Sequence, residues 1–214
     1  MPSSFAVGTN PFSVAIHDLN GDGKPDLVAA NDLSSSASVL LGNGAGGFAP
    51  AVSFATGPFA WSAEPGDFNL DGKLDLAVAN FGANTVSILL GNGLGSFGTA
   101  MNVTVGSSPS RAAVGDFNGD GSVDIATSNF GSASASILIA NGLGGFAPAV
   151  NVAVGTQPYF IVIGDLNHDG HADLVTANSG SANVSILHGT GAARSRRSRP
   201  SPSAWARDLW HWGI

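Results

Sequence analysis

The chain has 214 residues, with 30 glycines, no cysteine, 11% charged residues and 43% hydrophobic residues, and its formal net charge is −7. The absence of cysteine excludes disulfide frameworks, thiolate metal sites and cysteine nucleophiles. No apolar run approaches the roughly 18 residues of a membrane-spanning helix, so no membrane span is expected. The first residues carry neither the basic nor the apolar part of a secretory signal, and we expect any export signal to lie outside this sequence.

Four copies of one sequence unit follow each other with a period of 49 residues. The strings D-L-N-G-D-G-K-P-D, D-F-N-L-D-G-K-L-D, D-F-N-G-D-G-S-V-D and D-L-N-H-D-G-H-A-D begin at Asp18, Asp67, Asp116 and Asp165. A fixed period of this length is typical of repeat architectures. We therefore take residues 1–193 as one repeat domain.

Each unit is predicted to contain four short strands. In the first unit, short and often β-branched apolar runs occupy residues 13–16, 27–30, 38–41 and 51–54, and turn residues separate them. Residues 42–48, G-N-G-A-G-G-F, supply the positive φ values of a tight connection between the third and fourth strands. Nothing carries a helical period over 11 or more residues. The pattern predicts an all-β fold, a β-propeller of four-stranded blades.

Two places depart from the pattern. Glu64 and Pro65 stand where other units have ordinary strand residues, and a proline there removes a ladder hydrogen bond. Residues 5–8, F-A-V-G, match residues 54–57 and are predicted to form the fourth strand of a unit whose first three strands are missing. This strand either closes a small four-bladed ring or belongs to an incomplete arc of a larger propeller, and we favour the arc.

The repeated loop has the chemistry of a calcium site. The spacing D-x-N-x-D-G-x-x-D matches positions 1, 3, 5, 6 and 9 of an EF-hand loop, and oxygen-only ligands favour Ca²⁺ over zinc or copper. Three carboxylates within nine residues repel each other unless a cation lies between them. Turn-forming Asx residues are the alternative reading, but they do not explain four identical spacings. Position 12 falls on Ala29, Val78, Thr127 and Thr176, so the loops are not helix–loop–helix hands.

The predicted ligands are side chains at positions 1, 3, 5 and 9 and the backbone carbonyl at position 7. One Ca²⁺ is expected in each repeat, up to four in all. The ligands, loop by loop, are Asp18, Asn20, Asp22, Lys24 and Asp26; Asp67, Asn69, Asp71, Lys73 and Asp75; Asp116, Asn118, Asp120, Ser122 and Asp124; and Asp165, Asn167, Asp169, His171 and Asp173.

These features resemble the FG-GAP and VCBS repeat families, β-propellers related to the head of integrin α chains. The resemblance rests on D-x-N-x-D-G-x-x-D-[LI], on the F-G pairs at 81–82 and 130–131, and on G-x-G-G-F-A-P at 44–50 and 142–148, and it covers residues 5–191. It implies a piece of a longer, usually seven-bladed bacterial protein that carries its own signal peptide. It also implies an extracellular or cell-surface place and a function in adhesion or in binding glycans or proteins.

Residues 194–214 differ abruptly in composition. They hold five of the eight basic residues and three of the four tryptophans, whereas residues 1–193 hold three basic and 14 acidic residues, a formal charge of −11. Codon constraints allow the neighbouring reading frame of this tail to spell letters that match the earlier repeats. We interpret the tail as aberrant, either frameshifted or disordered. The anionic repeat domain has no basic stripe and is not expected to bind nucleic acid.

Three functions remain open at this stage. A calcium-stabilised, non-catalytic binding or adhesion module is favoured, because the sequence has repetition without an evident catalytic constellation. The candidate ligand-binding residues are Phe12, Trp61, Arg111 and Tyr159, although such side chains also fill gaps between blades. The alternatives are an accessory or catalytic propeller of a secreted polysaccharide-degrading enzyme, and a structural spacer. Every carboxylate except Asp32, Glu64 and Asp208 lies in a loop, which argues against an enzyme.

Overall fold

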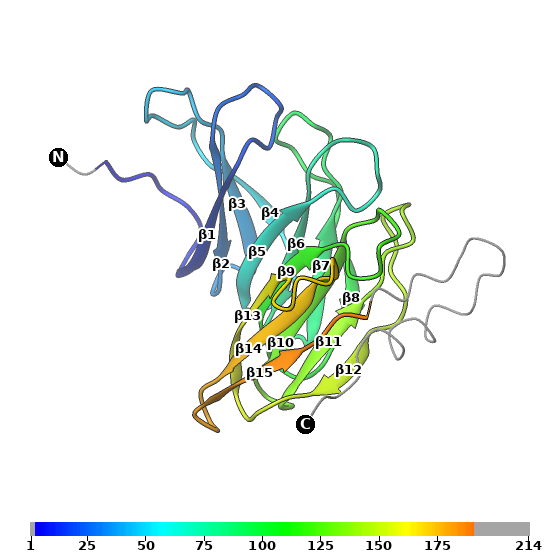
Figure 1. Ribbon diagram of the computed structural model, residues 1–214. Helices are drawn as coiled ribbons and strands as arrows, with labels where there is room; N and C mark the ends of the chain where they lie inside the picture. The colour runs from blue at the N-terminus through cyan, green and yellow to red at the C-terminus, as the bar shows by residue number, and fades with distance from the viewer. Residues whose placement is uncertain (1–2, 191–214) are drawn as a thin grey trace.

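A computed structural model describes residues 3–190, which form four antiparallel sheets in chain order (Figure 1). We name the sheets blades 1 to 4. Blade 1 contains β1 (Pro11–His17), β2 (Asp26–Asn31), β3 (Ser36–Leu40) and β4 (Val52–Ala55). Blade 2 contains β5 (Ala60–Gly66), β6 (Asp75–Asn80), β7 (Thr85–Leu89) and β8 (Met101–Thr104). Blade 3 contains β9 (Pro109–Gly115), β10 (Asp124–Asn129), β11 (Ser134–Leu138) and β12 (Val150–Ala153), and blade 4 contains β13 (Pro158–Gly164), β14 (Asp173–Asn178) and β15 (Asn183–Leu187).

Each blade is an up-and-down meander, so its strands pair only with their neighbours in sequence. The connection between the third and fourth strands turns where Gly44 and Gly46 have φ values of 75° and 82°, a conformation that favours glycine. Asn43 fixes this turn, because its Oδ1 accepts the N–H groups of Ala45 and Gly47 at 2.8 and 3.0 Å. The predicted strands and the all-β class are confirmed, and the described residues contain no helix that could span a membrane.

Pro65 is accommodated within β5, which keeps its register with β6 and pairs Pro65 with Leu76. The prediction that Pro65 breaks the blade pattern is wrong. The reason is topological: β5 is the edge strand of its sheet, so one of its sides has no strand partner and a missing N–H need not remove a ladder bond.

The core lies between the blades. Three apolar clusters fill the three interfaces, and each joins the branched or small side chains of one blade to the aliphatic side chains of the next. The innermost strands β1, β5, β9 and β13 contact each other in that order. Blade stacking through both faces of each sheet therefore supplies the apolar burial that a single four-stranded sheet lacks.

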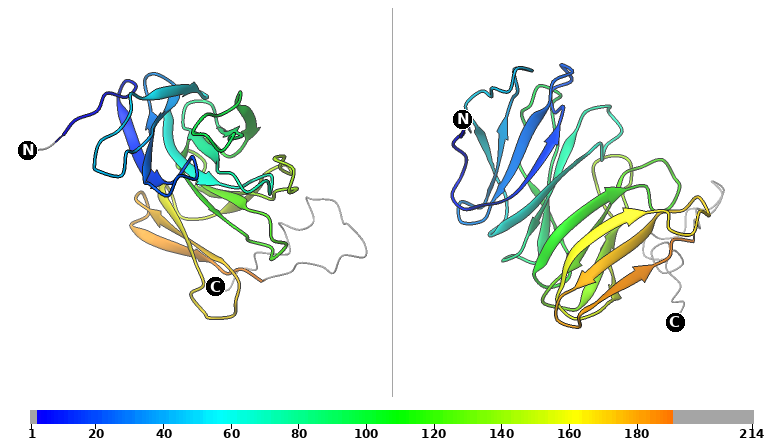
Figure 2. Two further views of the ribbon diagram at one scale, coloured as in Figure 1. Left: turned by 90° about the horizontal axis from the view of Figure 1, so that it is seen from above. Right: turned by 60° about the vertical axis from the view of Figure 1, so that its left-hand side comes forward.

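The blades form an open arc and not a closed ring (Figure 2). No strand of blade 4 pairs with blade 1 or with residues 3–10, so blade 4 has three strands within the described part of the chain. Residues 5–8 are not a β-strand, in contrast to the prediction, because no neighbouring strand lies beside them to complete a ladder. The predicted arc is confirmed over residues 3–190, and the predicted aberrant tail at 194–214 lies outside the described residues.

Candidate functional site

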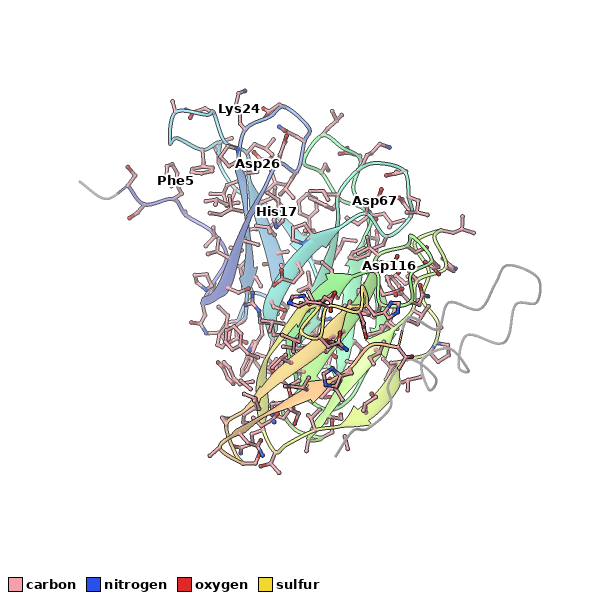
Figure 3. The ribbon with its side chains drawn as sticks, in the orientation of Figure 1. Phe5, His17, Lys24, Asp26, Asp67 and Asp116 are labelled. Atoms are coloured by element: carbon pink, nitrogen blue, oxygen red, sulfur yellow. The ribbon has the colours of Figure 1, made fainter. Side chains whose placement is uncertain are left out.

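The four acidic loops lie together on one side of the arc. Each loop joins the first strand of a blade to the second, and Figure 3 shows Lys24, Asp67 and Asp116 in successive loops on that side. The loops turn at glycines with positive φ, at position 6 of the motif in every copy: Gly23, Gly72, Gly121 and Gly170 have φ values of 79°, 80°, 88° and 84°. The prediction that this glycine makes the sharp turn is therefore confirmed.

The aspartate at position 1 organises the turn from within. In the first loop, Asp18 Oδ1 accepts the N–H groups of Gly21 and Asp22 at 2.8 and 3.1 Å, and its Oδ2 accepts that of Gly23 at 2.7 Å. Asp67, Asp116 and Asp165 make the corresponding bond to the position-6 glycine at 2.9, 2.8 and 3.0 Å. A carboxylate that accepts several backbone N–H groups fixes the loop's conformation.

The aspartate at position 9 is fully buried in all four blades: Asp26, Asp75, Asp124 and Asp173 each have 0% of their surface exposed. In blade 1, Asp26 Oδ2 accepts the Leu19 N–H at 2.9 Å and Oδ1 accepts the Gly42 N–H at 2.7 Å. The other three copies make the same two bonds at 2.8–3.0 Å. This residue therefore ties the acidic loop to the hairpin between the third and fourth strands, a bridging contact that the sequence pattern did not predict.

The charge states of these aspartates differ with their surroundings. Burial, together with the smaller effect of the nearby charges of Asp120 and Asp116, raises the pKa of the Asp124 carboxyl to about 8 against the opposing effect of two backbone N–H bonds. Burial also raises the pKa of Asp75. The exposed carboxyl of Asp22 has a lowered pKa, because it accepts the backbone N–H of Lys24 and the Lys24 ammonium lies 3.1 Å away. Bringing the negative charges of one loop together is thus unfavourable in the protein alone.

The donor set fits a hard cation. It consists of carboxylate and amide oxygens, and an ionised carboxylate has about four acceptor positions, of which Asp18 uses three. Over residues 3–190, no three histidine, aspartate or glutamate side chains are gathered around one point as metal ligands, because these oxygens face backbone N–H groups. Loops 1 and 2 also hold a lysine ammonium beside position 5, whereas loops 3 and 4 have Ser122 and His171 at the lysine position.

A second polar and aromatic constellation lies at the opposite end of the inner strands. The aromatic cluster, as we call it, consists of Phe12, Trp61, Phe81, Phe130 and Tyr159. Trp61 is stacked between Phe12 and Phe81, with ring centroids 4.4 and 3.7 Å apart. Phe130 and Tyr159 continue the cluster at centroid separations of 6.1–6.3 Å. It thereby spans blades 1 to 4.

Polar groups flank the aromatic cluster. Trp61 Nε1 donates to Asp32 Oδ1 at 3.1 Å. The Arg111 guanidinium pairs with Glu64 Oε1 at 3.1 Å and lies 4.9 Å from the centre of the Phe160 ring. Burial raises the pKa of Glu64, and the charge of Arg111 opposes this.

The structure brings three of the four candidate ligand-binding residues into one aromatic cluster, since Phe12, Trp61 and Tyr159 contact each other through their rings. Arg111 joins through Phe160, whose ring lies 5.8 Å from that of Tyr159. Sequence reasoning missed Phe81 and Phe130 as members, along with the flanking carboxylates. The signal was available in the repeat: positions 32, 81, 130 and 179 are equivalent, and only two of them are aromatic.

A sequence model of the family described as FG-GAP-like repeat matches the chain three times, over residues 18–78, 67–127 and 116–176. No curated protein matches the chain. Among solved structures, the chain is similar to a lectin of Agrocybe aegerita described as recognising non-reducing terminal N-acetylglucosamine. The identity is 20%, the match covers 85% of this chain and 50% of the lectin, and the TM-score is 0.57. BBS1N, solved in complex with ARL6DN, matches at 16% identity over 85% of this chain and 57% of its own, also with a TM-score of 0.57.

At these identities the structural likeness shows the fold alone, a β-propeller architecture. The chain spans about half the length of the structures that it matches.

Proposed function

The chain belongs to the FG-GAP-like repeat family, and from that premise we propose that it is a calcium-stabilised, non-catalytic module that binds glycans through the aromatic cluster. The observation that carries the proposal is the break in repetition at this cluster. Equivalent positions hold Phe12, Trp61, Ser110 and Tyr159, whereas positions 1, 3, 5, 6 and 9 of the acidic loops are identical in all four units. A recognition surface on a repeated frame is expected to consist of such non-repeated residues.

Calcium is proposed to hold the four acidic loops. When bound, the ion supplies positive charge beside carboxylates whose own charges raise the pKa of a neighbour, as those of Asp116 and Asp120 do for Asp124. The chain's own residues then do the structural work: Asp18 fixes its loop and Asp26 links that loop to the next hairpin. The ion is thus expected to stabilise the fold and not to take part in a reaction.

The affinity for calcium decides where the module works. Loops of this kind in extracellular modules bind at about 10⁻⁴ to 10⁻³ M, a range that is filled only where calcium is millimolar. We therefore propose an extracellular or cell-surface place. Calorimetric titration is expected to give up to four sites in this range, and vacant loops at millimolar calcium would contradict both the calcium site and the place.

The aromatic cluster suits a sugar ring. Exposed rings such as that of Phe12, which is 43% exposed, offer a flat apolar surface on which the C–H face of a pyranose can pack. The nearby Asp32, Glu64 and Arg111 offer charged hydrogen-bond partners for hydroxyl groups. Apolar walls with a few polar groups are the usual composition of a small-ligand site. Because the lectin of similar fold recognises non-reducing terminal N-acetylglucosamine, amino sugars are the first ligands to test.

A glycan array in the presence of calcium tests the proposal. We expect Phe12→Ala and Trp61→Ala to abolish the binding seen with the unmodified chain. Leu143→Ala is the control, since Leu143 is 82% exposed in a hairpin on the side of the acidic loops. Absence of glycan binding, or binding that survives both aromatic substitutions, contradicts the ligand assignment and leaves the calcium assignment to its own titration. Glycan cleavage in a reducing-end assay contradicts the non-catalytic assignment.

A further inference from the structure

The two ends of the arc each present an apolar sheet face on which no further blade packs. On blade 4, this end face is the side of the sheet opposite to the one that packs on blade 3. None of its members is charged, and the Arg111 guanidinium of blade 3 reaches the Phe160 ring at 4.9 Å. Its members are Phe160, Val162, Val175, Ala177, Val184 and Ile186. They form a grid, because Phe160 pairs with Ala177 and Ala177 with Val184, while Val162 pairs with Val175 and Val175 with Ile186. Val184 is 62% exposed.

On blade 1, the end face lies on the opposite side of the sheet. Val14, Leu27 and Leu40 lie on it. Val14 is 64% exposed, whereas Leu40 is 2% exposed and lies beside Phe5 and Val7. A groove of about 450 Å³ runs between this face and the segment Phe5–Val7. Large exposed apolar patches of this kind mark interaction surfaces.

The three internal interfaces show what covers such faces. The first partner in each interface contributes three equivalent apolar positions: 28, 37 and 39 in blade 1, 77, 86 and 88 in blade 2, and 126, 135 and 137 in blade 3. The following blade contributes another three equivalent apolar positions: 63, 76 and 89 in blade 2, 112, 125 and 138 in blade 3, and 161, 174 and 187 in blade 4. Adding 49 to the first set of positions in blade 3 gives Val175, Val184 and Ile186 of blade 4. Subtracting 49 from the second set in blade 2 gives Val14, Leu27 and Leu40 of blade 1. The two end faces are therefore the two halves of the same interface.

The segment Phe5–Gly8 forms no ladder, but it lies against blade 1 as the end of β4 and the residues after it lie against blade 2. The Phe5 and Phe48 rings meet edge to face at 5.2 Å and 78°, as the equivalent Phe54 and Phe97 rings do at 5.3 Å and 79°. The Gly8 N–H donates to Ser38 Oγ at 3.2 Å, and the equivalent Gly57 N–H donates to Ser87 Oγ at 3.1 Å. Blade 4 lacks the corresponding outer strand, because the outer edge of β15 has no partner strand among the described residues.

We propose that two copies of this chain associate head to tail, blade 4 of each packing on blade 1 of the other, with residues 3–6 of each copy completing the other's blade 4 as its outer strand. The occupant of each end face is thus a second copy. Because each copy offers both end faces, the same contact occurs twice, a two-fold axis relates the two copies, and the pair closes into a ring.

The length of the chain is compatible with a pair. The match covers 50% and 57% of two solved propeller structures, so two copies are about as long as one of those chains. Both end faces are apolar and complementary in register, and burying them repeats the interactions that already hold the blades together. The proposal rests on neither the calcium sites nor the glycan site.

The mass of the full chain in solution tests the association. Light scattering coupled to size exclusion is expected to give about twice 21.3 kDa. Val184→Asp is expected to weaken self-association at least about 100-fold, because it leaves an unpaired carboxylate at the apolar interface. Leu143→Asp is the matched control, with an aliphatic-to-aspartate change at an exposed hairpin, and is expected to remain dimeric. A monomeric unmodified chain, or a V184D variant as dimeric as the control, overturns the proposal.

An engineered disulfide tests the register and identifies the occupant. Ser38 and Ser53 are cross-strand partners in blade 1, with their Oγ atoms 2.8 Å apart, and the equivalent pair across the proposed contact is Ser185 of one copy and Ser4 of the other. Because the chain has no cysteine, Ser4→Cys with Ser185→Cys is expected to give a covalent dimer on a non-reducing gel. Ser4→Cys with Val184→Cys, which places the second thiol on the opposite face of β15, is the control and should not link. An intramolecular disulfide, which means that the chain closes on itself, overturns the proposal, as does equal linking in both variants.

Discussion

Replacing Val78 with threonine should stabilise the protein by about 1 kcal/mol. The reason lies in an asparagine that ends the second strand of every blade. Asn80 Oδ1 is buried without a hydrogen-bond partner, while its Nδ2 donates to Thr85 Oγ1 at 3.0 Å and Ser87 Oγ at 2.8 Å. Ser87 Oγ donates its only proton to Asn102 Oδ1 at 2.7 Å, so it can only accept from the Asn80 amide, and a flip of that amide would lose this bond.

In blade 3, the equivalent asparagine oxygen has the hydrogen-bond donor that Asn80 Oδ1 lacks in blade 2. Thr127, which is equivalent to Val78, donates its hydroxyl to Asn129 Oδ1 at 2.9 Å, and Thr176 does the same for Asn178 in blade 4. Val78 and Thr127 both have 0% of their surface exposed. Threonine and valine have nearly the same shape, so the substitution opens no cavity.

The magnitude follows from two opposing terms. Satisfying a buried acceptor is worth about 1–3 kcal/mol. Losing one buried methyl group costs about 0.8 kcal/mol. The surplus is about 1 kcal/mol, which raises the melting temperature of a protein of this size by about 2–4 °C.

Thermal and urea unfolding in saturating calcium measure the effect, and Thr127→Val supplies the reverse experiment. T127V should destabilise by about 1–2 kcal/mol, because it creates the orphan acceptor that V78T removes. If V78T leaves the midpoint unchanged or lowers it while T127V is harmless, the hydroxyl-to-amide bond is not what distinguishes the blades and the reasoning is refuted.

The other predictions concern the acidic loops and are all followed by melting temperature. Chelation with EGTA should lower it, with the fall scaling with the number of occupied loops, and an unchanged melt would falsify the structural role of calcium. Asp26→Asn should lower the free energy of unfolding by about 2 kcal/mol even in EGTA, because an amide nitrogen cannot accept the N–H of Leu19 or Gly42. A loss of stability seen only with calcium present would assign Asp26 to the metal alone. In EGTA, the melting temperature should fall as pH rises from about 4 to 8. Burial raises the pKa of Asp124 to about 8, so the folded state holds this proton more tightly than the unfolded state does. A melting temperature that rises over this pH window contradicts the shift.

The repeat made most of the fold predictable. Local signals recur every 49 residues and agree with each other: apolar runs of strand length, glycines where φ is positive, and asparagines that close the turns. Such signals depend on a few neighbouring residues, so they can be seen without knowledge of the rest of the chain. The failures at Pro65 and at residues 5–8 share one cause, which is that edge position and strand pairing depend on which strand lies alongside.

The candidate sites divide in the same way. The acidic loops are short, contiguous stretches, and the sequence alone determined their oxygen donors and the turn glycine, since ligand spacing and backbone conformation are local properties. Only the tertiary structure decided that Asp26 joins two loops 16 residues apart, and that Trp61 of blade 2 is stacked between rings of two blades. Those contacts depend on how the sheets stack and on which side chains the stacking brings to one end of the arc. The repeat shows which positions are equivalent, but long-range packing decides which of their side chains touch.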